Sequence, residues 1–105
     1  MPKYLATARY SPDGLKGVLG TGGTARAEAL RKAIEGLGGT LISFDYAFGA
    51  EDVVLIIEFP DNVAAAALGL AVSAAGAASV RITVLISPEE IDQAAKKTVA
   101  YTPPR

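Results

Sequence analysis

A glycine-rich segment is the clearest place in this sequence where a charged ligand could bind. Residues 20–25 read Gly-Thr-Gly-Gly-Thr-Ala, and we expect a helix to open at Thr24 or Ala25. A break just before a helix leaves backbone N–H groups free, and the helix dipole favours an anion there. The alternative is a structural kink with Thr24 as the helix N-cap. The residues predicted to bind the anion are Lys16, Thr21, Gly22, Gly23, Thr24 and Arg26.

The same segment matches the pattern G-x-G-x-x-A of dinucleotide sites, but its context differs from theirs. That motif directly follows a strand and opens a βαβ unit. Here roughly ten residues, expected to be helical, separate it from the first predicted strand. We therefore predict no nicotinamide site, and no cofactor.

Aromatic residues alternate on two predicted strands: Tyr4, Tyr10, Phe44, Tyr46 and Phe48. Strand side chains alternate between the two faces of a sheet, so Tyr46 and Phe48 are expected to project together. They would line a ring-walled cavity in which phenol groups supply hydrogen bonds. Packing between subunits explains the same pattern, and a cavity at a subunit boundary would satisfy both interpretations.

Carboxylates gather at the turn before the third predicted strand, at Asp45, Glu51 and Asp52. Paired carboxylates can do acid–base work or hold a hard cation, but a solvated turn is the commoner case, and we predict no metal site. Asp52 is predicted to reach the cavity rim and hydrogen-bond to a ligand. Ion pairing with Arg9 or Arg81 would instead make these acids structural.

Composition excludes several kinds of chemistry. The chain has no cysteine and no histidine, which removes thiolate metal sites, cysteine nucleophiles and Ser-His-Asp catalysis. Ten basic and eleven acidic residues show no basic stripe, so no nucleic-acid partner is expected. The first residues lack the apolar core of a signal peptide, and the longest apolar stretch, residues 63–78, is shorter than the ~20 residues of a spanning helix. We therefore expect no membrane contact and a cytoplasmic location.

The elements that would position these residues follow from hydrophobic spacing and cap signals. Their order is βαββαβ plus a terminal helix, which predicts one α+β domain over residues 1–105 with a ferredoxin-like fold. Right-handed crossovers would place both main helices on one face of the sheet. The predicted strands are 3–10, 40–48, 53–59 and 80–86, and helices are predicted from Ser11, over 24–37, over 63–76 and over 88–98.

The bare face of this sheet is expected to carry apolar and aromatic side chains. Half of the residues are hydrophobic, which is hard to hide in a chain of 105 residues. A second copy of the same sheet would cover the face, and so we predict a homo-oligomer.

Short motifs spread along nearly the whole chain form a recognisable order: residues 1–4, 22–26, 37–39, 48–49, 52–54, 70–72, 88–90 and 101–104. This order resembles the GYD domain family, small proteins grouped with the dimeric α/β barrels. The resemblance implies the fold and an oligomer, but no established reaction. One position departs from the pattern, because Glu51 stands where the family has its tyrosine.

Three functions remain open from the sequence. The first is a small-molecule-binding or accessory oligomer, with a small anionic or aromatic ligand. The second is a cofactor-free enzyme of oxygenase or isomerase type that uses the aromatic cavity. The third is a purely structural assembly subunit.

Overall fold

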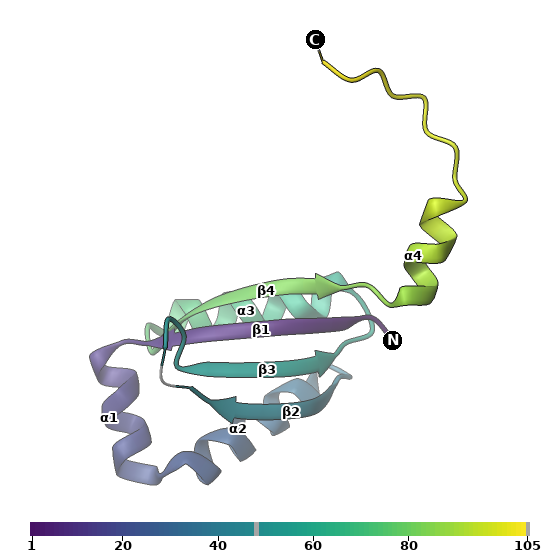
Figure 1. The fold of residues 1–105 in the computed structure, drawn as a ribbon. Helices are drawn as coiled ribbons and strands as arrows, with labels where there is room; N and C mark the ends of the chain where they lie inside the picture. Colours follow the sequence, from purple (N-terminus) through teal and green to yellow (C-terminus); the bar gives the residue numbers. More distant parts are fainter. Residues whose placement is uncertain (48, 105) are drawn as a thin grey trace.

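The computed structural model describes residues 1–47 and 49–104, and in these residues the chain forms four strands and four helices (Figure 1). The sheet is antiparallel throughout, in the order β2-β3-β1-β4. This arrangement confirms the predicted ferredoxin-like α+β class. The elements are β1 (Lys3–Tyr10), α1 (Pro12–Thr21), α2 (Gly23–Gly36), β2 (Thr40–Tyr46), β3 (Val53–Glu58), α3 (Asn62–Ala75), β4 (Ala78–Leu85) and α4 (Pro88–Ala95).

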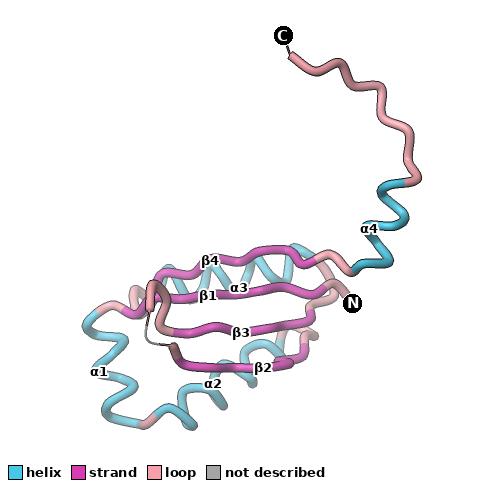
Figure 2. The backbone as a smooth tube through the Cα atoms, viewed as in Figure 1, coloured by secondary structure: helices cyan, strands magenta, loops and turns pink. Residues whose placement is uncertain are grey.

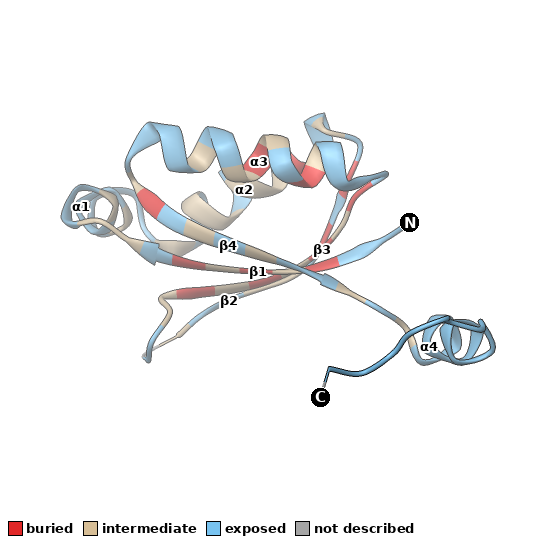
Figure 3. Ribbon diagram, turned by 90° about the horizontal axis from the view of Figure 1, so that it is seen from above, coloured by how far each residue is buried: buried red, intermediate tan, exposed pale blue. Residues whose placement is uncertain are grey.

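The core lies between the sheet and the helices α2 and α3, which cover one face together (Figure 3). Alternate residues of the two central strands are buried there, as the period of two requires. The Tyr4 hydroxyl donates to Asn62 Oδ1 at 2.6 Å, and its ring meets Phe59 edge-on at 5.8 Å. The phenol is thus satisfied inside an apolar core. The buried residues of the central strands are Tyr4, Ala6, Ala8, Val53, Leu55 and Ile57.

Strand β2 departs from the predicted alternation. Its register against β3 shifts between Leu41 and Ser43, so Ile42 is an extra residue in the strand. The bulge puts Leu41, not Ile42, on the same face as Phe44. Leu41 is accordingly buried and Ile42 exposed.

The break between the first two helices is shorter than predicted. Helix α1 continues through Thr21, α2 begins at Gly23, and only Gly22 lies between them. Gly22 has φ 87° and ψ 163°, a conformation that is essentially restricted to glycine. It is also the N-cap of α2, so the expectation that Thr24 caps this helix is wrong.

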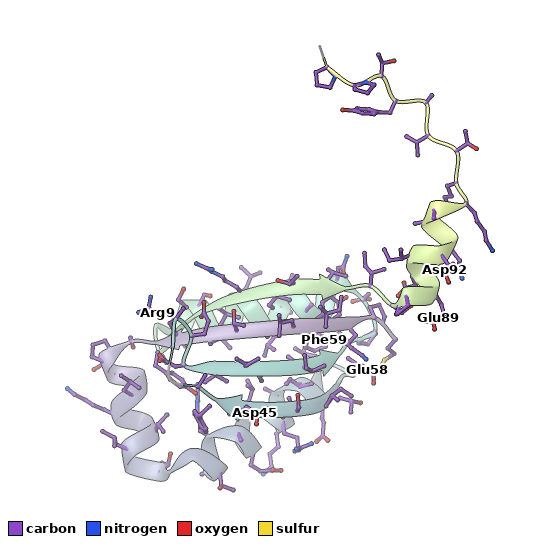
Figure 4. The ribbon with its side chains drawn as sticks, in the orientation of Figure 1. Arg9, Asp45, Glu58, Phe59, Glu89 and Asp92 are labelled. Carbon is purple, nitrogen blue, oxygen red and sulfur yellow. The ribbon has the colours of Figure 1, made fainter. Side chains whose placement is uncertain are left out.

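The uncovered face of the sheet is aliphatic. Its centre is formed by Leu5, Val54 and Ile56, all half-buried. The expected aromatic side chains are not on this face, because Tyr4, Tyr10, Phe44 and Tyr46 share the helix face of β1 and β2. Charged side chains surround the centre, and Figure 4 labels three of them. They are Lys3, Arg9 and Arg81 on the β1–β4 half, and Asp45 and Glu58 on the β2–β3 half.

The terminal helix stands away from the rest of the molecule. Helix α4 begins with a capping box, in which the side chains of Ser87 and Glu90 each accept from the other's backbone N–H group. It ends at Ala95, short of the predicted Thr98, and an extended tail follows it (Figure 2). No helix in the described part of the chain is both long and apolar enough to span a bilayer.

Candidate functional site

The start of α2 meets the end of β2 at one corner of the molecule. There the Tyr46 hydroxyl donates to the Gly23 carbonyl at 3.0 Å. A Cβ atom at Gly23 would lie only 2.9 Å from Tyr46 Cε2, so the ring packs where a side chain would otherwise sit. The structure therefore brings together two parts of the predicted site that are far apart in sequence, the glycine break and Tyr46.

Two more aromatic side chains complete this corner. The Phe44 and Tyr46 rings meet edge to face with centroids 5.2 Å apart. Partial burial raises the pKa of Tyr46, since it disfavours the phenolate, and the neighbouring Tyr10 phenol acts in the same direction. The positive charge of Arg26 opposes this shift. Tyr46 consequently stays protonated near neutral pH, which suits a hydrogen-bond donor and not a general base.

A small hollow opens beside this corner, between the sheet and the helices α2 and α3. Its volume is about 40 Å³, and Tyr10 and Arg26 are its polar lining residues. The other lining side chains come from the apolar stripes of both helices and from the strands. They include Leu30, Val53, Leu55, Leu68, Val72 and Val80.

A groove between α2 and α3 extends the hollow toward the surface. It has a volume of about 220 Å³ and shares Arg26, Leu30, Leu68 and Val72 with the hollow. Alanines form most of the remaining wall, and their short side chains keep the two helices from filling the space. The groove alanines are Ala29, Ala33, Ala71, Ala75 and Ala77.

Among the residues that the structure describes, Arg26 is the one cation on these linings. Within residues 1–47 and 49–104, the ion pairs closer than 4.0 Å are Arg31–Glu28 and Arg81–Glu51, and Arg26 belongs to neither. Arg26 is half-buried as a residue and lines an apolar space. Such a group can bind a carboxylate or another small anion through paired N–H donors.

Asp52 has a structural role in this fold. Its Oδ2 accepts from the Tyr10 backbone N–H at 2.8 Å, and its own N–H donates to the Ala8 carbonyl at 2.8 Å. The residue thereby fixes the end of β1 against the β2–β3 turn. Glu51 pairs with Arg81 at 3.9 Å, one of the partners the sequence suggested for these acids. Nowhere in the described residues do three or more potential metal-ligating side chains come together.

Of the predicted residues that the structure describes, Arg26 alone lines the hollow and the groove. The Thr21 hydroxyl donates to the Gly17 carbonyl at 2.9 Å, one turn back in α1. Lys16 and Thr24 are exposed, and neither lines the hollow or the groove. Phe48, predicted beside Tyr46, lies outside the described residues. Of the predicted residues, the structure groups Gly23, Arg26 and Tyr46 at one corner.

Several lining residues were absent from the predicted site. Leu30, Leu68 and Val72 belong to helical stripes that the spacing identifies as core, and core and cavity residues carry the same apolar signal. Tyr10 had a stronger signal, because it is an aromatic residue that follows the small Ala6 and Ala8 on the buried face of its strand. In the structure, the charged Arg26 lies on the lining of both spaces, between side chains that are otherwise mostly apolar.

The architecture defines the class of this protein, a ferredoxin-like α+β domain with an apolar opening under its helix layer. The family model of the GYD domain matches residues 4–95, nearly the whole chain. The protein therefore belongs to the GYD domain family, as the sequence resemblance predicted. Neither the curated proteins nor the solved structures contain a match to it.

Proposed function

We propose that the protein is a homo-oligomer that binds a small amphipathic anion in the groove between α2 and α3. The observation that supports this most directly is Arg26, a half-buried cation that lines an apolar space and pairs with no carboxylate within residues 1–47 and 49–104. Partial desolvation of a guanidinium costs free energy, and a bound carboxylate would offset that cost.

The size and lining of the groove indicate the kind of ligand. At about 220 Å³ the groove is smaller than the ~300–1,000 Å³ typical of drug-sized ligands. An aromatic acid or a short fatty acid would suit it, with the apolar body along the alanines and the carboxylate at Arg26. Tyr10 lines the adjoining hollow, as Arg26 does, and its hydroxyl is a second donor on that lining.

The oligomer would form through the uncovered face of the sheet. Leu5, Val54 and Ile56 give this face an apolar centre. The β1–β4 half carries three basic residues and the β2–β3 half two acidic ones, so two copies related by an axis parallel to the strands would oppose unlike charges. This assembly leaves the groove open, because the groove lies on the other side of the sheet.

Calorimetric titration with naphthoate and octanoate tests the binding proposal. We expect saturable binding to the native protein and about tenfold weaker binding to Arg26→Gln, the effect of losing one charge-assisted contact. Arg31→Gln is the matched control on the same helix, where the charge is paired with Glu28 instead, and its affinity should equal that of the native protein.

The neutral analogue naphthyl methanol tests the role of charge. It should bind weakly, and to native protein and Arg26→Gln alike. Absence of binding by either acid, or equal binding by both arginine variants, would contradict the proposal and leave a purely structural subunit as the better account. Turnover of a bound acid would favour the cofactor-free enzyme.

A further inference from the structure

The C-terminal arm, residues 88–104, contains α4 and the tail and lies apart from the rest of the chain. Every residue of the arm is exposed. Its large apolar side chains are open to solvent, with Ile91 52%, Val99 75% and Tyr101 69% exposed. The radius of gyration is 16.7 Å, against about 13 Å for a compact chain of this length.

An arm that stands away from the rest of its chain is not expected to be stably folded by itself. Helix α4 has 8 residues, whereas helices shorter than ~12–15 residues are marginal in water without packing. Its capping box stabilises the first turn only, and Ile91, Ala94 and Ala95 form an apolar side on which all three residues are exposed. The arm therefore needs a surface from another molecule.

The direction of the arm indicates where that surface lies. The helices α2 and α3 lie on one side of the sheet and the arm on the other, beyond the edge strand β4 (Figure 3). A second copy on the uncovered face would sit next to the arm. If unlike charged halves of the two sheets oppose each other, the β4 edge of one copy faces the β2 edge of the other.

We propose that the arm of each copy packs along the β2 edge of a second copy, an inference that rests on the homo-oligomer proposed above. An edge strand presents unpaired N–H and C=O groups that an extended segment can use. Val99 and Tyr101 alternate in the extended tail and both point to the same side if it pairs as a strand. The arm thus covers an open edge while its own apolar side chains are removed from water.

A spin label distinguishes contact within a chain from contact between chains. The protein has no cysteine, so Val99→Cys provides a single attachment site for a nitroxide. The spin-labelled chain is made without isotope enrichment and is mixed with isotope-labelled native chain. Only the amide signals of the native chain are then observed. We expect broadening of the β2 amides, residues 40–46, with the amides of α2 and α3 unaffected.

A pair of variants supplies the energetic test. Tyr101→Ser should weaken self-association in sedimentation equilibrium at least severalfold, whereas Leu70→Ser, which removes an equally exposed side chain on α3, should leave it unchanged. Both positions are exposed, so neither change threatens the core.

The outcomes separate the arm from the oligomer. A dimer that persists without β2 broadening, or with broadening on the helices, would overturn the arm contact and leave the sheet-face dimer standing. A monomer at every concentration would overturn both. Weaker association in Leu70→Ser but not in Tyr101→Ser would move the interface to α3.

Discussion

Replacing Gly22 by alanine isolates the cost of the backbone conformation that separates α1 from α2. Gly22 has φ 87° and ψ 163°, and a Cβ added there would meet no atom within 4 Å. The substitution therefore introduces backbone strain without a steric clash. Strain of this kind costs about 1–3 kcal/mol, which we expect as a loss in the free energy of unfolding.

A second glycine in the same segment provides a control, because its replacement by alanine should change the free energy of unfolding in the opposite direction. Gly17 lies inside α1 and also has open space around its Cβ position. Alanine there should stabilise the protein by up to about 1 kcal/mol, because glycine is a poor helix former. The two variants should thus differ by roughly 1–4 kcal/mol although they lie in one segment.

Urea unfolding followed by far-UV circular dichroism measures both variants at one fixed protein concentration, since oligomerisation makes stability concentration-dependent. In thermal unfolding, each 1 kcal/mol should move Tm by about 4–8 °C. Native stability or better in Gly22→Ala would refute the reasoning, because it would mean that this residue does not hold a positive φ.

Three further changes test the frame around the site. Phe59→Ala should lower the free energy of unfolding by about 3–5 kcal/mol in urea, because the ring is fully buried. Asp61→Ala should cost about 1 kcal/mol in the same assay, since its carboxylate accepts the Ala64 N–H as the α3 N-cap. Hydrogen bonds from Ser87 lower the pKa of Glu90 below its ordinary value of 4.5, so α4 is stabilised above that pH and loses the contribution as the pH falls through the lowered pKa. The protection factors of the α4 amides, which correct for the intrinsic pH dependence of exchange, should fall on acidification in the native protein. Glu90→Gln, which keeps an acceptor but cannot titrate, should show no such fall, and native protection factors that do not change with pH would contradict this.

Local patterns predicted the fold because several of its signals are strong and agree with one another. The alternation in residues 3–10 and the Ser87-Pro88 helix start are both observed. The break at Gly22 was predicted too broadly, since a glycine within a helix costs only about 1 kcal/mol and α1 tolerates Gly20. The bulge at Ile42 has no local signal, because β-branched residues suit either face of a strand.

The sequence predicted some residues of the candidate site but not the contacts that bring them together. Arg26 and Tyr46 were selected as a charge near a glycine break and a ring on a strand, but their meeting depends on how α2 packs on β2. The partner of Asp52 is a backbone N–H of Tyr10, which no pairing of charges along the sequence indicates. The groove between α2 and α3 depends on how the two helices pack together, so the apolar stripe of either helix alone does not predict it.

The most direct test of the central claim is an amide NMR titration of the native protein with naphthoate. The account predicts saturable shifts at Tyr10, Arg26, Leu30, Leu68 and Val72, the residues around the hollow and the groove. The midpoint of these shifts should lie at about tenfold higher naphthoate concentration in Arg26→Gln but be unchanged in Arg31→Gln. Shifts confined to the uncovered face of the sheet, or identical shifts in both arginine variants, would contradict it.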